Sequence, residues 1–179
     1  MIKEVSVGGI SVSCFSSIKD VINSAILDDK NVIPGVGIAI NPEKVIAASN
    51  DESIKTAIES ATLRYPDGIG VFYVMAKKSG NKIARIPGCE LWENLMYASA
   101  EQKIPVYLIG ASEAVITETK KRLMAKGVNI VGHRNGYFGN DDVDDVISNI
   151  KNSGAKIVTV ALGSPKQELF IFESVNRLV

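Results

Sequence analysis

The sequence predicts an α/β protein, with a Rossmann-like, doubly wound and mainly parallel sheet that follows a small N-terminal β-hairpin. From residue 104 onward, apolar strand patterns alternate with amphipathic helix patterns, which indicates parallel βαβ units. The late strand patterns, such as Ile157–Leu162, are apolar at nearly every position. Strands of this kind are expected where helices cover both faces of a sheet.

The hairpin is predicted at the start of the chain, where residues 4–14 (EVSVGGISVSC) alternate in polarity around a Gly-Gly pair. The elements that follow are less regular up to residue 104. They are a helix over 16–27 capped by Ser16 or Ser17, a strand over 32–42, helices over 42–49 and 51–61, a short strand over 62–68, and helices over 70–80 and 88–103.

The second half has the regular rhythm. Strands are predicted over 105–111, 129–132 and 156–163, and each is followed by a helix, over 112–127, 140–154 and 164–179. We find no internal repeat and no linker composition, so the prediction is a single domain over residues 1–179.

The bulk composition excludes several classes of protein. Lys plus Arg equals Asp plus Glu at 20 each, so no net field attracts nucleic acid, and we expect no nucleic-acid partner. The two cysteines show no paired spacing with histidine, which fits a reducing compartment and excludes a zinc cage. The N-terminus lacks a signal peptide and no apolar run spans a bilayer, so the expected location is cytoplasmic.

In open α/β sheets the ligand lies outside the carboxyl ends of the strands, so these ends are where functional residues are expected. Five of them carry polar or glycine-rich segments. These are 39–44 (AINPEK), 65–70 (YPDGIG), 109–113 (IGASE), 132–138 (GHRNGYF) and 163–168 (GSPKQE).

The last of these segments has two interpretations. In the first it is only a well-capped helix start, because Gly163 permits a turn, Ser164 can cap and Pro165 suits the first helical position. That interpretation leaves Lys166 and Gln167 unexplained. Free backbone N–H groups together with a lysine would suit a phosphate group, so the second interpretation is an anion site.

Asp67 is likewise open to two interpretations, a plain Asp-Gly turn or a carboxylate held at a strand end as a general base. The segment at 109–113 lacks the G-x-G-x-x-G pattern, which argues against an NAD-dependent oxidoreductase. His133, the single histidine, is interpreted as an ordinary loop residue near the crevice. Arg85 precedes a Pro-Gly turn, where it could clamp a diphosphate, and Trp92 has core-helix spacing.

Asp142 and Asp144 form a D-x-D pattern, which many sugar-nucleotide enzymes use to hold a divalent metal. Here the pattern opens a predicted helix, where acidic residues complement the dipole, and residues two apart do not share a helix face. We therefore favour a structural role for both carboxylates and predict no metal site.

Taken together and in order, these motifs resemble the WecG/TagA/CpsF family of bacterial glycosyltransferases. The resemblance covers nearly the whole chain. It rests on 39–44, 65–71 (YPDGIGV), 85–96 (RIPGCELWENLM), 106–111 (VYLIGA), 128–138 (VNIVGHRNGYF) and 154–170 (GAKIVTVALGSPKQELF).

The resemblance implies an inverting transfer of an N-acetylmannosamine-type sugar from UDP to N-acetylglucosamine, which is linked through diphosphate to undecaprenol. It implies that Asp67 is the catalytic base, and it implies no metal or other cofactor. The candidate substrate-binding residues are Asn41, Arg85 and Gln167 from the family motifs, with Gly110, Gly136, Tyr137, Gly163 and Lys166 from the strand ends.

The branch of the family is suggested by Ala39, because teichoic-acid (TagA-type) members typically carry threonine there. The segments AIN and GAKIVTVALGSPKQE look like the WecG-type branch, which handles N-acetylmannosaminuronic acid for enterobacterial common antigen. The alternatives are a TagA-type N-acetylmannosamine transferase and a non-catalytic sugar-nucleotide-binding domain. The resemblance also implies a homo-oligomer, peripheral to the inner face of the cell membrane.

Family members continue beyond the segment that matches the end of this chain. They add a strand, a glycine-rich turn and a basic, apolar C-terminal segment that helps to close the site, whereas this chain stops at Val179. We therefore expect a C-terminally truncated chain with weak or no transfer activity.

Overall fold

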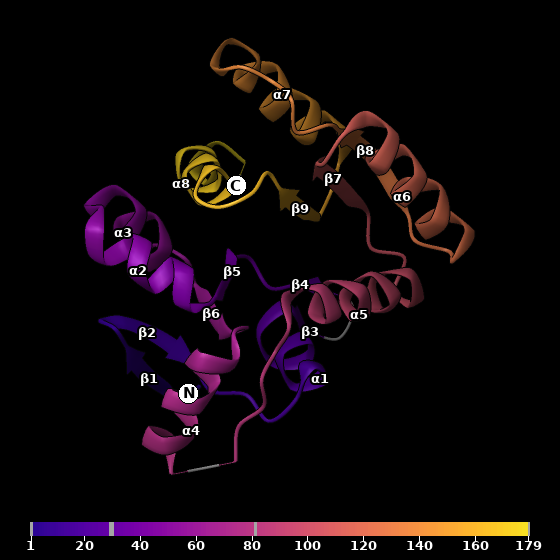
Figure 1. The fold of residues 1–179 in the computed structure, drawn as a ribbon. Helices are drawn as coiled ribbons and strands as arrows, with labels where there is room; N and C mark the ends of the chain where they lie inside the picture. The colour runs from indigo at the N-terminus through magenta and orange to yellow at the C-terminus, as the bar shows by residue number, and fades with distance from the viewer. Residues whose placement is uncertain (1, 29–30, 81, 179) are drawn as a thin grey trace. The chain divides into compact units, whose positions relative to one another are not determined.

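The computed structural model describes residues 2–28, 31–80 and 82–178, and it divides the chain into two compact units (Figure 1). Unit 1 covers Met1–Asn94 and unit 2 covers Leu95–Val179. Each unit is built around strands of its own. The single domain over residues 1–179 stays a prediction.

Unit 1 opens with the predicted hairpin. Strands β1 (Glu4–Val7) and β2 (Ile10–Ser13) pair antiparallel. The strands β5 (Gly37–Ile40) and β6 (Leu63–Pro66) then pair in parallel. The helices of this unit are α1 (Ile18–Val21), α2 (Pro42–Asn50), α3 (Glu52–Glu59), α4 (Ile69–Ser79) and the first turns of α5 (Gly88–Glu101).

The helix predicted over 16–27 is shorter and less regular than expected. Ser17 caps α1 by accepting a hydrogen bond from the Asp20 amide at 3.0 Å, but the helix continues as a π-helical turn, η1 (Ile22–Ile26). Leu27 is extended and buried, and it begins a short antiparallel pair, β3 (Leu27–Asp28) with β4 (Asn31–Val32). The strand predicted over 32–42 is therefore split, with Pro34 between its two parts.

The two faces of the β5–β6 pair have different roles. Ile38 and Ile40 point into a buried cluster that also contains Val71 and Met75 of α4. Because side chains alternate along a strand, the register partners Ala39 and Tyr65 point to the opposite face, where both are only half-buried. Ala39 and Tyr65 therefore lie on the less buried face of the strand pair, close to the carboxyl ends of both strands.

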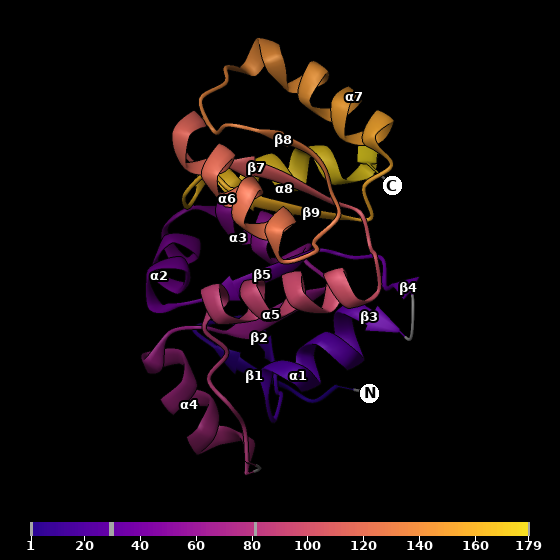
Figure 2. The same cartoon turned by 90° about the vertical axis from the view of Figure 1, so that its right-hand side faces the viewer.

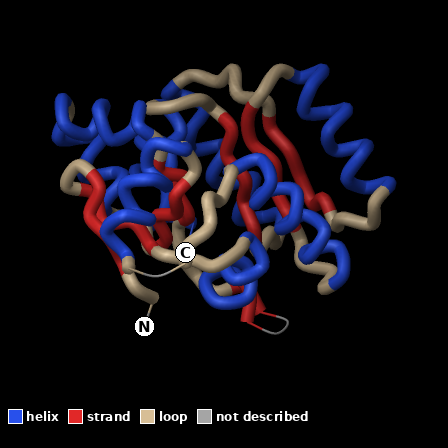
Figure 3. Tube along the Cα trace, turned by 60° about the horizontal axis from the view of Figure 1, so that its bottom comes forward, coloured by secondary structure: helices blue, strands red, loops and turns tan. Residues whose placement is uncertain are grey.

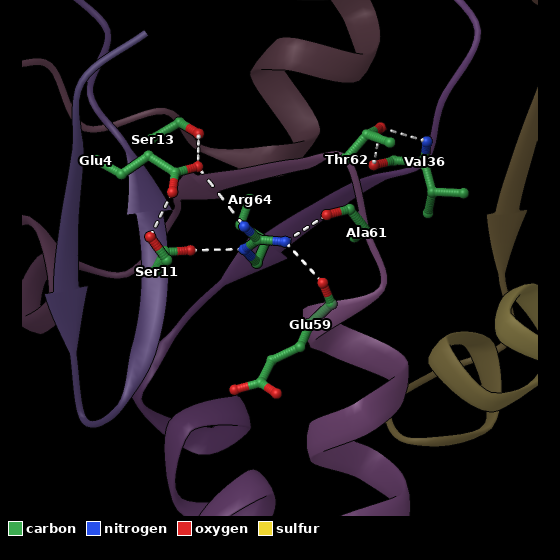
Figure 4. A network of polar contacts seen from close by, with 8 residues as sticks. All are labelled: Glu4, Ser11, Ser13, Val36, Glu59, Ala61, Thr62 and Arg64. Carbon is green, nitrogen blue, oxygen red and sulfur yellow. Dashed lines mark hydrogen bonds and ion pairs between the residues drawn. The ribbon is translucent and has the colours of Figure 1, made fainter.

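Arg64 ties the hairpin, β6 and the end of α3 together (Figure 4). Its Nε donates to the Ser11 carbonyl at 2.6 Å, and its Nη1 donates to the carbonyls of Glu59, at 3.0 Å, and Ala61. Its Nη2 lies 3.6 Å from the carboxylate of Glu4. A guanidinium at the carboxyl end of α3 also complements the helix dipole.

Unit 2 is a three-stranded parallel sheet with strand order β8-β7-β9. Its strands are β7 (Val106–Gly110), β8 (Ile130–Arg134) and β9 (Ile157–Ala161). Its helices are α6 (Glu113–Ala125), α7 (Val143–Ser153) and α8 (Lys166–Leu178), with a short 3₁₀ turn, η2 (Asn140–Asp142), before α7.

Helices cover both faces of this sheet, with α6 on one side and α8 on the other (Figures 1 and 2). On the α7 and α8 side, Tyr107 and Ile109 of β7 pack with Ile150 and Phe170. This is the covered parallel sheet that the apolar strand patterns predict. Figure 3 distinguishes the helices (blue), the strands (red) and the loops (tan) along the Cα trace of the chain.

Two details of unit 2 correct the sequence-based prediction. His133 is a strand residue of β8 and not a loop residue, because the pairing with β7 continues through Leu108–His133 to Arg134. Pro165 lies just outside α8, which begins at Lys166, and the Ser164–Pro165 peptide bond is cis.

The α/β class, the parallel sheets and the antiparallel N-terminal hairpin are confirmed. Parallel pairing is present in β5–β6 and in β8-β7-β9, and the β1–β2 hairpin is antiparallel.

The Arg64 contacts predict a stability effect. Arg64→Met should lower the free energy of unfolding by about 2–3 kcal/mol, because the half-buried carbonyls of Ser11 and Ala61 lose the donor that Arg64 supplies. Urea denaturation measures this change. The control is Arg122→Met, which removes an exposed ion pair to Glu118 and should cost less than about 0.5 kcal/mol. Equal losses in the two variants would contradict this role for Arg64.

Candidate functional site

Asn41 and Asp67 directly follow the paired strands β5 and β6. The Asp67 amide donates to the Ile40 carbonyl at 3.0 Å and so extends the parallel pairing by one step. A Cβ built on Gly68 would lie 2.6 Å from Cδ of Pro42 and 3.3 Å from Cβ of Asn41, so glycine is required where the two turns approach. The structure therefore brings Asn41 and Asp67 together at one edge.

Asn41 has a structural task at this edge. Its Oδ1 accepts a hydrogen bond from the Lys44 amide at 2.9 Å, and it is the N-cap of α2. Its Nδ2 group takes no part in the cap, so a donor remains for a ligand. The Lys44 side chain turns back to donate to the Ala39 carbonyl at 3.1 Å.

The carboxylate of Asp67 is oriented by the start of α5. Its Oδ1 accepts a hydrogen bond from the Gly88 amide at 3.2 Å, and Gly88 is the first residue of that 14-residue helix. A helix N-terminus favours a negative charge. One oxygen of the carboxylate is thus held by the protein, and the other can face a substrate.

Tyr65 lies on the same face of the strands as Asp67. Burial raises the pKa of the Tyr65 phenol, and the negative charge of Asp67 raises it further. The phenol is protonated at neutral pH even without this shift, so it can donate a hydrogen bond beside the carboxylate.

Arg85 is placed close to the end of β6. The amide of its neighbour Ile86, which is fully buried, donates to the Pro66 carbonyl at 2.7 Å. The Arg85 side chain itself is exposed. The backbone of Ile86 is therefore fixed to Pro66, the residue before Asp67, and the exposed guanidinium of Arg85 belongs to the residue that precedes Ile86.

In unit 2 the carboxyl ends of the three strands are held close together. The Ala111 amide donates to the Ala161 carbonyl at 3.2 Å, and the Gly136 amide donates to the Ala111 carbonyl at 2.9 Å. Gly110 has a φ of +125°, and a Cβ on it would lie 2.1 Å from the Ala161 carbonyl oxygen. Gly110 thus has a packing role in addition to the substrate contact predicted for it.

Lys166 joins this group. Its Nζ donates to the Gly136 carbonyl at 3.3 Å and lies 5.1 Å from the centre of the Phe138 ring. The side chain of Gln167 donates to Glu168 at 2.8 Å. Tyr137 is 81% exposed, and nothing lies within 4 Å of a Cβ built on Gly163.

The predicted site residues therefore form two groups, each within one unit. Asn41, Asp67 and Arg85 lie at the strand ends of unit 1. The group in unit 2 consists of Gly110, Gly136, Tyr137, Gly163, Lys166 and Gln167.

The acidic pair at 142 and 144 has structural partners. Asp142 accepts a hydrogen bond from the Gly139 amide at 2.9 Å, and Asp144 pairs with Arg177 at 2.8 Å. Over residues 2–28, 31–80 and 82–178, no group of three or more His, Cys, Asp and Glu side chains is arranged to hold a metal ion. In the same part of the chain, every helix is too short or too polar to span a bilayer.

Two residues at the edge of unit 1 were missed by the sequence analysis as site residues, Tyr65 and Gly88. Both lie inside segments that were singled out, YPDGIG and RIPGCELWENLM, but neither has a signal of its own. Tyr65 could have been found from the period of two, which places it on the same strand face as Asp67.

A polar site at the carboxyl ends of parallel strands is typical of α/β enzymes. Residues 5–179 match the sequence profile of the Glycosyl transferase WecG/TagA/CpsF family, so the chain belongs to this family. Membership makes it a glycosyltransferase of cell-surface polysaccharide synthesis, which joins a sugar from a donor to an acceptor.

The close approach at Gly110 predicts a large loss of stability on substitution. Gly110→Ala should lower the free energy of unfolding by about 3 kcal/mol, because the methyl group meets the Ala161 carbonyl and φ is positive. Thermal or urea unfolding measures this loss. Gly154→Ala is the matched control, because φ is +69° there but the space is open, and it should cost about 1 kcal/mol. A Gly110→Ala chain as stable as the control would contradict the packing role.

Proposed function

We propose that this chain is an inverting glycosyltransferase that moves N-acetylmannosaminuronic acid from UDP to undecaprenyl-diphosphate-linked N-acetylglucosamine. The observation that carries the proposal is Asp67, a carboxylate at a strand end with one oxygen held by the Gly88 amide. Family membership supplies the reaction class. The product would serve cell-surface polysaccharide synthesis of the enterobacterial common antigen type.

In the proposed reaction Asp67 removes the proton from the acceptor hydroxyl as that oxygen attacks the anomeric carbon. The new bond joins the acceptor oxygen to that carbon, and the bond from the same carbon to the UDP oxygen breaks. UDP leaves with the electron pair, and the configuration inverts because the displacement is direct. Asp67 then gives its proton to solvent.

The leaving diphosphate would be stabilised by cationic and N–H groups of the protein. In unit 1 we assign this task to the exposed cation Arg85. For unit 2 the sequence motifs predict contacts of its own to a nucleotide sugar, by Lys166, Gln167 and the backbone at Gly110, Gly136, Tyr137 and Gly163. No metal or other cofactor takes part in this scheme, so we expect transfer to persist in EDTA.

The donor sugar is assigned from the resemblance of the segments AIN and GAKIVTVALGSPKQE to the WecG-type branch, with Ala39 in place of the threonine that TagA-type members typically carry. The TagA-type alternative uses the neutral N-acetylmannosamine instead, and the second alternative is a domain that binds a sugar nucleotide without chemistry. We place the protein, as a homo-oligomer, on the inner face of the membrane, where its lipid-linked acceptor lies.

The first prediction of this proposal concerns Asp67. Asp67→Asn should lower transfer by about 10²–10⁴-fold, because the amide cannot accept the proton. It should leave UDP binding intact, because the amide oxygen still accepts from Gly88. Transfer is measured with both donors in parallel, using the 179-residue chain and a C-terminally extended version, and UDP binding is measured by calorimetry.

The outcomes of that experiment are distinct. Transfer of the uronic acid alone, lost in Asp67→Asn, supports the proposal. Transfer of the neutral sugar moves the protein to the TagA-type alternative. UDP binding without transfer from either donor leaves the non-catalytic domain, and full activity of Asp67→Asn excludes Asp67 as the base.

A second prediction separates the two tasks of Asn41. Asn41→Asp keeps an oxygen for the cap of α2, so stability should be unchanged, whereas transfer should fall about tenfold through the lost Nδ2 donor. Asn41→Ala should lose transfer and also about 1 kcal/mol of stability. Unchanged transfer by Asn41→Asp would limit Asn41 to capping.

A further inference from the structure

The start of α5 leaves a small open space beside Asp67. A Cβ built on Gly88 would lie 3.5 Å from the Tyr65 hydroxyl oxygen, 3.7 Å from Cβ of Ala39 and 3.8 Å from Oδ2 of Asp67. All three are ordinary van der Waals distances, so one methyl group would fill this space without a clash. Packing therefore does not require glycine at position 88.

The backbone conformation does not require glycine either. Gly88 is helical, and its φ lies outside the positive range in which glycine is favoured. Alanine is more favourable than glycine by about 1 kcal/mol in a helix interior, and Gly88 is the first residue of α5. Glycine therefore brings no helix stability that alanine would lack at the residue whose amide holds Asp67.

The two oxygens of Asp67 have different surroundings. Oδ1 accepts the Gly88 N–H at 3.2 Å, and Oδ2 faces the space that the missing Cβ leaves. The Tyr65 hydroxyl faces the same space, and Ala39 and Tyr65 are register partners on this face of the strands. The Tyr65 phenol is protonated at neutral pH, so it is a hydrogen-bond donor facing the same space as an acceptor oxygen.

We infer that Gly88 is a positioning and specificity-determining residue for the transfer: its amide orients Asp67, and its missing side chain keeps open the place where the acceptor hydroxyl meets Oδ2 and the Tyr65 hydroxyl. This inference rests on the proposed function, because it takes Asp67 as the base. It adds Gly88 and Tyr65 to the groups that act on the acceptor, as distinct from the nucleotide sugar.

The test is Gly88→Ala, which retains the N–H group and only fills the space. We expect a chain at least as stable as the original, with the KM for the donor unchanged within about twofold and kcat/KM for the acceptor lowered about tenfold or more. A general structural defect would lower stability or donor binding, and this variant should lower neither.

Two further variants sharpen the test. Gly37→Ala is the matched control, because its Cβ would meet only Leu63 at 3.6 Å, and it should leave both kinetic constants unchanged. Tyr65→Phe removes only the hydroxyl and should lower kcat/KM for the acceptor about tenfold, with donor KM unchanged.

The inference and the proposed function fail in different ways. If the original chain transfers sugar, Asp67→Asn does not, and Gly88→Ala equals the original, the inference is overturned and the proposed function stands. If Gly88→Ala loses donor binding in proportion to transfer, Gly88 belongs to the donor site and the inference is also overturned. If the original chain transfers no sugar, the proposed function fails first and the inference fails with it.

Discussion

The parallel pairing of β5 with β6 is the constraint on which the candidate site of unit 1 depends. The register Ala39–Tyr65 continues to the Asp67 amide, which bonds to the Ile40 carbonyl at 3.0 Å. A shift of one residue would turn Tyr65 and Asp67 to the buried face, because side chains alternate along a strand. The apolar packing of Ile38 and Ile40 therefore also fixes where the carboxylate points.

At the turns that follow the strands, single residues likewise serve both the fold and the candidate site. Asn41 caps α2 and keeps its Nδ2 group for a ligand, and the amide of Gly88 begins α5 and orients Asp67. In unit 2, Gly110 and Gly136 allow three strand ends to approach, and Lys166 donates to the backbone there. Groups that complete the local fold also build the site, so a loss of activity in a variant needs a stability measurement beside it.

The sequence predicts most of the fold because its strongest signals are local. The apolar run at Ile157–Leu162 indicates a strand, and the serines at positions 16 and 17 indicate a helix start, without help from distant residues. The break at Leu27 and the extension of β8 to Arg134 depend on pairing with other segments, and for this reason the pattern misses them. Gly88 was missed for the same reason, since its proximity to Asp67 is set by the meeting of β6 with α5, whereas the strand period of two already places Tyr65 on the same face as Asp67.

Arg64 has a consequence for how the enzyme responds to acid and base. Arginine stays charged at every pH used in enzyme assays, and three of its four contacts are to backbone carbonyls, which do not titrate. The hydrogen bonds by which Arg64 of β6 connects the hairpin to the end of α3 therefore persist from mildly acidic to alkaline solution. A change of activity with pH in that interval would therefore not arise from the loss of these three Arg64 contacts.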